Sequence, residues 1–157
     1  MKKPSIIISD WLFSTLAGAF VENGCLYTPE SCDGGAVIIP GTYNNGEFSL
    51  ESGPIAGGKV YPLAVKEEVK APYIVYDDIS TRFESTKDGR YPSEVSFRIL
   101  VVAKTFNEAE EIAEAVESVV TSRKIPELGF VAVEGIRCGY DAGSGGYLEE
   151  MSCSINL

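Results

Sequence analysis

The chain has 157 residues, of which 45% are hydrophobic and 23% are charged, a balance typical of one globular domain. It carries 13 basic against 23 acidic residues, so its formal net charge is −10. No lysine or arginine lies between Lys3 and Lys59, and the sequence offers no basic stripe for nucleic-acid phosphates. Composition therefore disfavours tight nucleic-acid binding.

The residue types that usually build catalytic and metal sites are sparse. The sequence contains no histidine, which removes the commonest metal ligand and the usual general base. Its four cysteines lack the CxxC spacing of zinc sites. They fit either two disulfides in a secreted chain or four free thiols in a reducing compartment, and we favour the second. The cysteines are Cys25, Cys32, Cys138 and Cys153.

The N-terminal residues fit two interpretations. The N-terminal segment resembles a secretory signal peptide, because it begins with Met1–Lys3, continues with an apolar run and ends in the small residues of Leu16–Ala19. Asp10 lies inside that run, where an acid is costly on membrane insertion, and no segment is long and apolar enough to span a membrane. The alternative is an amphipathic helix that begins at Pro4. Its apolar face would comprise Ile8, Trp11, Leu12 and Leu16.

Residues 22–58 differ in composition from the rest of the chain, with 8 of the 16 glycines and 3 of the 8 prolines. Asn45-Gly46 is a strong hairpin turn signal, because both residues tolerate positive φ. Ala36–Ile39 and Glu47–Leu50 would be the two strands of this hairpin. We expect an inserted, hairpin-bearing loop within a single domain of residues 1–157.

The remaining residues predict strands and one further helix. Apolar residues recur at helical spacing from Ala109 to Val120, with Thr105 or Asn107 as the cap. Asp88-Gly89 marks a turn before a long alternating strand. The glycine-rich stretch 139–146 lacks the Lys-Ser/Thr of a phosphate loop and favours a mobile turn. Strands are expected at Lys59–Pro62, Tyr73–Tyr76, Val95–Lys104, Phe130–Val133 and Met151–Leu157.

These elements predict an α+β domain. Strands joined by short turns favour an antiparallel sheet of about four to five strands. Two amphipathic helices would pack on one face of that sheet, and the inserted β-hairpin loop would lie beside it.

Three groups of residues deserve weighing as functional candidates. Asp77-Asp78 ends a predicted strand, but adjacent strand residues point to opposite faces, so we expect solubilisation and not a carboxylate pair. The glutamates of residues 108–117 are typical of a solvated helix face. Four tyrosines are explained as half-buried strand aromatics, with interface anchoring as the alternative. These are Tyr61, Tyr73, Tyr76 and Tyr91. No residue is predicted to be catalytic, cofactor-binding or metal-binding.

The middle of the chain resembles the tail completion proteins of long-tailed bacteriophages. The resemblance covers about residues 59–125 and rests on the order and spacing of mostly structural residues. It begins with Lys59–Pro62 and Ala71–Tyr76, continues through a turn and a long strand, and includes the junction Val101–Thr105 before the helix. Members of the family are usually shorter, so the excursion at 22–58 is a departure from their pattern.

The resemblance implies a non-enzymatic structural protein of a phage or prophage virion tail, present in the host cytoplasm during assembly and without a cofactor. Similar proteins cap the tail tube as terminators or join the tail to the head, typically as a six-fold ring. The implied partners are further copies of the chain, the tail tube protein and the head–tail connector protein, without membrane or tight nucleic-acid binding. As a hypothesis, the excursion at 22–58 and the hairpin at 80–91 make contacts with neighbouring subunits or with the tail tube.

Two other classes remain open at this point. A secreted or periplasmic binding module would explain the signal-like start, the even number of cysteines and the tyrosine-rich strands. A histidine-free enzyme acting on a small molecule would need a pocket whose carboxyl groups have strongly perturbed pKa values.

Overall fold

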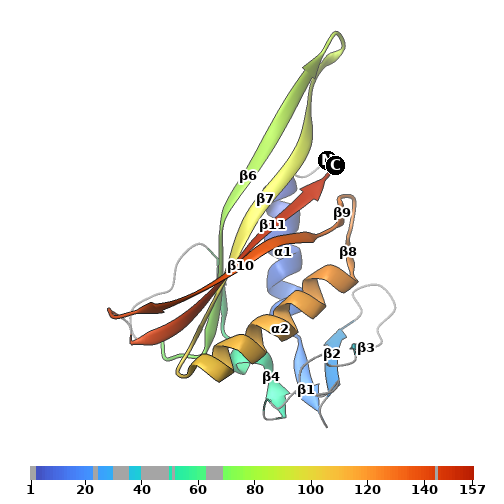
Figure 1. Ribbon diagram of the computed structural model, residues 1–157. Helices are drawn as coiled ribbons and strands as arrows, with labels where there is room; N and C mark the ends of the chain where they lie inside the picture. The colour runs from blue at the N-terminus through green and yellow to red at the C-terminus, as the bar shows by residue number, and fades with distance from the viewer. Residues whose placement is uncertain are drawn as a thin grey trace.

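The computed structural model describes residues 3–22, 25–29, 36–39, 50, 52–62, 69–143 and 145–157. Figure 1 shows two helices packed beside a long, twisted sheet. The elements in chain order are α1 (Pro4–Ala17), β1 (Phe20–Glu22), β2 (Cys25–Pro29), β3 (Ala36–Ile39), β4 (Gly53–Pro54), the 3-10 turn η1 (Ile55–Gly58), β5 (Val60–Pro62), β6 (Tyr73–Thr86), β7 (Gly89–Ala103), α2 (Phe106–Ser122), β8 (Lys124–Ile125), β9 (Gly129–Phe130), β10 (Ala132–Asp141) and β11 (Gly146–Asn156).

The main sheet has five strands in the order β10-β11-β7-β6-β5, which confirms an α+β fold. Four of these strands pair antiparallel, as expected from their short turns. β5 pairs with β6 in parallel, so the expectation of a wholly antiparallel sheet was wrong and the sheet is mixed. About ten residues separate β5 from β6, so this connection is longer than the short turns on which the antiparallel expectation rested.

The core is built from the inward face of the sheet and from both helices. β7 alternates as its sequence predicts, and Val95, Phe97, Ile99 and Val101 are buried. α2 contacts β7 and β11, α1 contacts β5 and β6, and the two helices also touch one another. The buried residues of all these elements form one hydrophobic cluster. Hydrophobic burial therefore holds both helices to the sheet.

α1 occupies the stretch for which a signal peptide was the competing interpretation. Its buried residues include all four that the amphipathic-helix alternative placed on one face: Ile8, Trp11, Leu12 and Leu16. Tyr76 of β6 is anchored to the same helix, because its hydroxyl contacts Ser9 Oγ at 3.0 Å and donates to the Ser9 carbonyl at 3.2 Å. The structure thus uses this segment as part of the core.

The excursion contributes a second, smaller sheet of order β3-β2-β1-β4. Ala36–Ile39 is a strand, as predicted, but its partner is β2. The predicted turn at 43–46 lies outside the described residues, as does all of Glu47–Leu50 except Leu50. Within the described residues, the excursion therefore forms strands of a small sheet, and the first strand of that sheet begins at Phe20, before the excursion.

Four strands extend well beyond the ranges that the sequence predicts, namely β6, β7, β10 and β11. Tyr73–Tyr76 is only the start of β6, which continues through an irregularity between Asp77 and Ser80 to Thr86. Asp78 has φ of 53° at this bulge, which lets the strand continue past the acidic pair. Similarly, the glycine-rich stretch is not simply a turn, because its first residues pair with β11 as far as Asp141.

Candidate functional site

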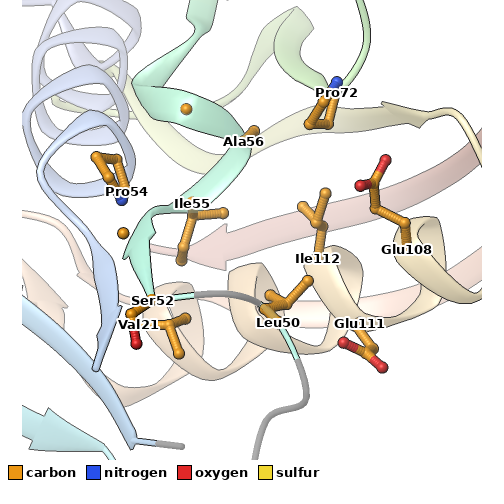
Figure 2. Close-up of a pocket in the computed structure, with 12 residues that line it drawn as sticks. Val21, Leu50, Ser52, Pro54, Ile55, Ala56, Pro72, Glu108, Glu111 and Ile112 are labelled. Atoms are coloured by element: carbon orange, nitrogen blue, oxygen red, sulfur yellow. The ribbon is translucent and has the colours of Figure 1, made fainter. Parts of the chain in front are cut away.

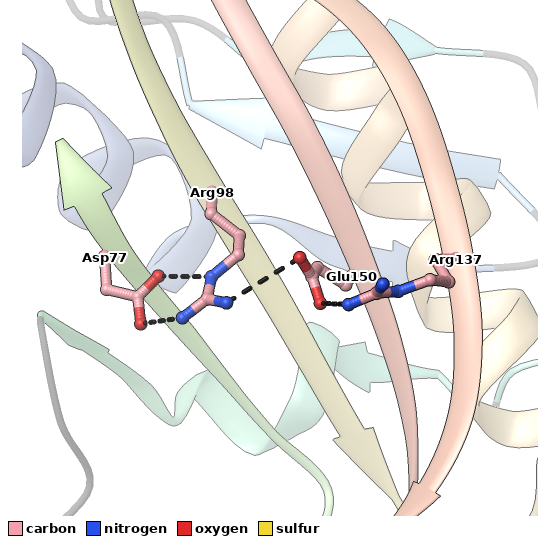
Figure 3. Close-up of polar contacts among 4 residues, drawn as sticks. All are labelled: Asp77, Arg98, Arg137 and Glu150. Atoms are coloured by element: carbon pink, nitrogen blue, oxygen red, sulfur yellow. Dashed lines mark hydrogen bonds and ion pairs between the residues drawn. The ribbon is translucent and has the colours of Figure 1, made fainter. Parts of the chain in front are cut away.

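A row of alternating charges crosses four strands of the main sheet (Figure 3). Arg98 of β7 donates from Nε and Nη2 to the two carboxylate oxygens of Asp77 on β6, both at 2.7 Å. On its other side, Arg98 Nη1 lies 3.7 Å from Glu150 of β11. Glu150 also accepts a hydrogen bond from Arg137 of β10 at 2.9 Å. Hydrogen bonding to Asp77 raises the pKa of Arg98 above its ordinary value.

The β6–β7 hairpin projects beyond the rest of the sheet (Figure 1). We call residues 80–93 the arm, because its β6 residues pair with no strand other than β7, and its β7 residues pair with no strand other than β6 among the described residues. Phe83 and Tyr91 are each 44% exposed on it. The guanidinium of Arg90 lies 4.2 Å from the centre of the Phe83 ring, and the Tyr91 hydroxyl donates to Glu84 at 2.9 Å. Exposed aromatic rings on an extended hairpin are typical of a contact surface.

A second polar group lies under α2, where Glu110 meets Cys138 of β10 and Glu149 of β11. Their ligand atoms all lie within 4.8 Å of one another. The Cys138 thiol is 3.1 Å from Glu110 and 3.2 Å from each carboxylate oxygen of Glu149. Hydrogen bonds to these carboxyl groups raise the pKa of Cys138 to about 12, so the thiol stays protonated and is a poor nucleophile or metal ligand at neutral pH.

A cavity of about 510 Å³ lies between the small sheet, η1 and the first turns of α2. Figure 2 shows Ile112 and Leu50 among its lining residues, with Glu108 and Glu111 on α2. The described lining has no cysteine, lysine or arginine.

The structure separates the acidic residues that the sequence places together. Asp77 is bound to Arg98, whereas Asp78 is exposed at the bulge, so the two carboxylates do not form a pair. The glutamates of α2 are not simply a solvated face. Glu110 belongs to the group under the helix, and burial beside Glu114 raises the pKa of Glu117. No periodicity in the sequence indicates that Cys138 and Glu149 approach Glu110.

The four candidate tyrosines lie on three strands and differ in exposure. Tyr76 is 2% exposed and belongs to the core, and Tyr61 and Tyr73 are half-buried. Tyr91 lies on the arm and is the exposed member of the set. The strand interpretation therefore suits three of them, and interface anchoring remains a prediction for Tyr91.

The cysteines Cys25, Cys138 and Cys153 are free, and Cys32 lies outside the described residues. Burial raises the pKa of Cys153 to about 12, consistent with its packing as a small hydrophobe. Neither α1 nor α2 combines the length and apolar character needed to cross a membrane.

Comparison with known proteins identifies a family and a related fold. The family model described as tail completion protein gp17 matches residues 54–142, more than half of the chain and all of β5, β6, β7 and α2. A solved chain from the "virion of native gene transfer agent (GTA) particle" is 17% identical, with a TM-score of 0.51 over 64% of this chain and 78% of that one, and so shares its fold. No curated protein sequence matches. The extent of the family match shows that the chain belongs to the tail completion family of bacteriophage structural proteins.

Proposed function

We propose that this protein caps the phage tail tube and forms its interface to the head connector, as a ring of identical copies. The observation that carries the proposal is the family match over residues 54–142. In this proposal the protein acts by binding and not by catalysis, because the family to which it belongs consists of virion structural proteins. Its place is the virion tail, and it assembles there from the host cytoplasm.

The domain is a single unit in which both helices cover one face of the main sheet. The opposite face carries the charge row of Asp77, Arg98, Glu150 and Arg137. This arrangement leaves the arm and the outer edge of β10 for neighbouring copies, because each presents unpaired backbone groups. A heterologous contact between an arm and another part of the next copy generates a ring when its rotation closes.

The charge of the protein fits a conduit for DNA. Six copies with a net charge of −10 each would carry roughly −60, a field that repels passing DNA and does not bind it. The inserted sheet of β1–β4 is this protein's own addition to the family pattern, and we assign it to contacts with the tube or with a neighbour.

Electron microscopy and native mass spectrometry of the untagged protein, alone and with purified tail tubes, test the proposal. We expect closed rings with a central hole, or rings at the ends of tubes. Monomers that leave the tubes uncapped would contradict it.

A shortened arm tests where the contacts lie. Arg82 pairs with Glu94, so replacing residues 83–93 by Asn-Gly closes the hairpin at that pair. We expect this variant to retain its circular dichroism spectrum and to lose ring formation. Asp10→Ala is the matched control, because it removes an exposed charge from α1, which belongs to neither of the two proposed contact surfaces. Normal rings from the shortened variant would refute the role of the arm.

A further inference from the structure

Glu149 is a buried acid whose charged and hydrogen-bonding neighbours, among the described residues, are Glu110 and Cys138 and include no basic group. Its side chain is 1% exposed, because it lies on β11 among residues that form the hydrophobic core. Across the sheet it stands between Cys138 of β10 and Val101 of β7, and α2 places Glu110 above it. The titratable groups that face it are thus a thiol from β10 and a carboxyl group from α2, with Tyr147 two residues along its own strand.

The carboxyl groups of Glu110 and Glu149 lie within 4.8 Å of one another, and Glu149 is buried. Ionisation of both groups would therefore carry a large cost in free energy. A neutral carboxyl group can instead donate a hydrogen bond to an ionised one. The Cys138 thiol supplies one further donor, so two donor protons serve the whole group. One carboxyl proton therefore satisfies this group, and its loss leaves two negative charges beneath the helix.

We propose that Glu110 and Glu149 share one proton, and that this proton holds the N-terminal half of α2 against β10 and β11. We call this contact between the helix and the two strands the α2–β10 joint. The joint loosens when the proton is lost. The same joint contains an aromatic cluster, in which Tyr147 of β11 contacts Phe106 of α2 and Tyr140 of β10. Loosening there frees the end of the β10–β11 hairpin from the helix. This inference does not depend on the proposed function.

The pKa shifts agree with the geometry. Burial raises the pKa of Glu149 to about 7, and hydrogen bonding to Glu149 lowers the pKa of Glu110. A carboxyl group whose pKa is raised by folding stabilises the fold fully below its ordinary value of 4.5, and this contribution is lost as pH rises through 7. The shift corresponds to as much as about 300-fold in the folding equilibrium constant. Glu110 has the opposite sign, and its contribution is lost in acid.

Urea unfolding between pH 5 and pH 8 tests the proposal. We expect the folding equilibrium constant of the wild type to fall across this range, and that of Glu149→Gln to stay nearly constant, because the amide donates as the neutral acid does. Glu150→Gln is the matched control. It lies on the same strand, binds Arg137, and should keep the wild-type pH dependence. Parallel pH profiles for wild type and Glu149→Gln would overturn the proposal.

A measurement on the unaltered protein remains decisive if Glu149→Gln fails to fold. Carbon-detected NMR of glutamate side chains should find one carboxyl group that titrates near pH 7, together with faster hydrogen exchange in β10 and the start of α2 at pH 8 than at pH 6, after correction for intrinsic rates. Glutamates that all titrate below pH 5.5 would refute the shared proton.

Discussion

Arg98 is the residue at which the structure makes its sharpest stability prediction. It lies 35% exposed between two carboxylates, with Asp77 17% exposed on one side and Glu150 23% exposed on the other. The paired hydrogen bonds to Asp77 have the fork geometry in which guanidinium and carboxylate bind best. We therefore expect Arg98→Ala to destabilise the fold through Asp77, which would keep its charge and lose its partner.

The magnitude follows from the exposure of the partners. A hydrogen bond to a charged group contributes about 1.5–3 kcal/mol, and removal of one partner also leaves a partly buried charge uncompensated. Solvent reaches Arg98, so we expect a total loss of about 2–3 kcal/mol, near the lower end of these effects combined. Arg137 occupies the outer end of the same row and is 81% exposed. Its replacement by alanine should cost less than about 0.5 kcal/mol.

Urea unfolding of both alanine variants, with a double-mutant cycle for Asp77→Asn and Arg98→Ala, measures these values. The cycle should give a coupling energy of at least about 1 kcal/mol. Arg98→Lys provides a further control, because it keeps the charge and loses the fork, and we expect it to recover only part of the lost stability. Equal losses for Arg98→Ala and Arg137→Ala, or a coupling energy near zero, would refute the reasoning.

Two more substitutions test the helices. Leu12→Ala removes a fully buried side chain from α1 and should cost about 3 kcal/mol, whereas Phe13→Ala, at a position 51% exposed, should cost less than about 0.5 kcal/mol by thermal unfolding. Similar losses would contradict the placement of α1 in the core. Thr105→Ala removes the acceptor that caps α2 through the Glu108 amide at 3.1 Å and should cost about 1 kcal/mol, with little change from Asn107→Ala.

The parts of the fold predicted from sequence are those in which a local pattern meets the core. α2 was expected from Ala109 to Val120 and extends from Phe106 to Ser122, because its amphipathic period and its Thr105 cap are local signals. The alternation of Val95–Ala103 has the same character. By contrast, no residue of the arm is buried, so its strands show no alternation of apolar and polar residues. The sequence therefore gives no local signal for their pairing.

The polar group under α2 was missed for a different reason. Glu110 has helical neighbours of like charge, and in sequence it is indistinguishable from a solvated glutamate. Cys138 and Glu149 belong to a hairpin whose first strand was interpreted partly as a mobile turn. Only the pairing of β10 with β11, and of β11 with β7, places these residues opposite one another. Such long-range register is the information that a single sequence carries least clearly.

The charge row at Arg98 and the polar group at Glu149 stabilise different parts of the sheet, and they differ in how they depend on pH. On one side, Arg98 joins β6, β7 and β11 through charges that neutralise one another and persist at any pH at which carboxylates are ionised. On the other side, the described groups that Glu149 meets are the carboxyl group of Glu110 and the thiol of Cys138, so its environment depends on a single proton. Consequently β6 and β7, which continue into the arm, are held by ion pairs that do not change between pH 5 and pH 8. The α2–β10 joint is held by a contact whose strength depends on pH. A ring formed through the arm would then retain its contacts at a pH at which the edge at β10 loosens.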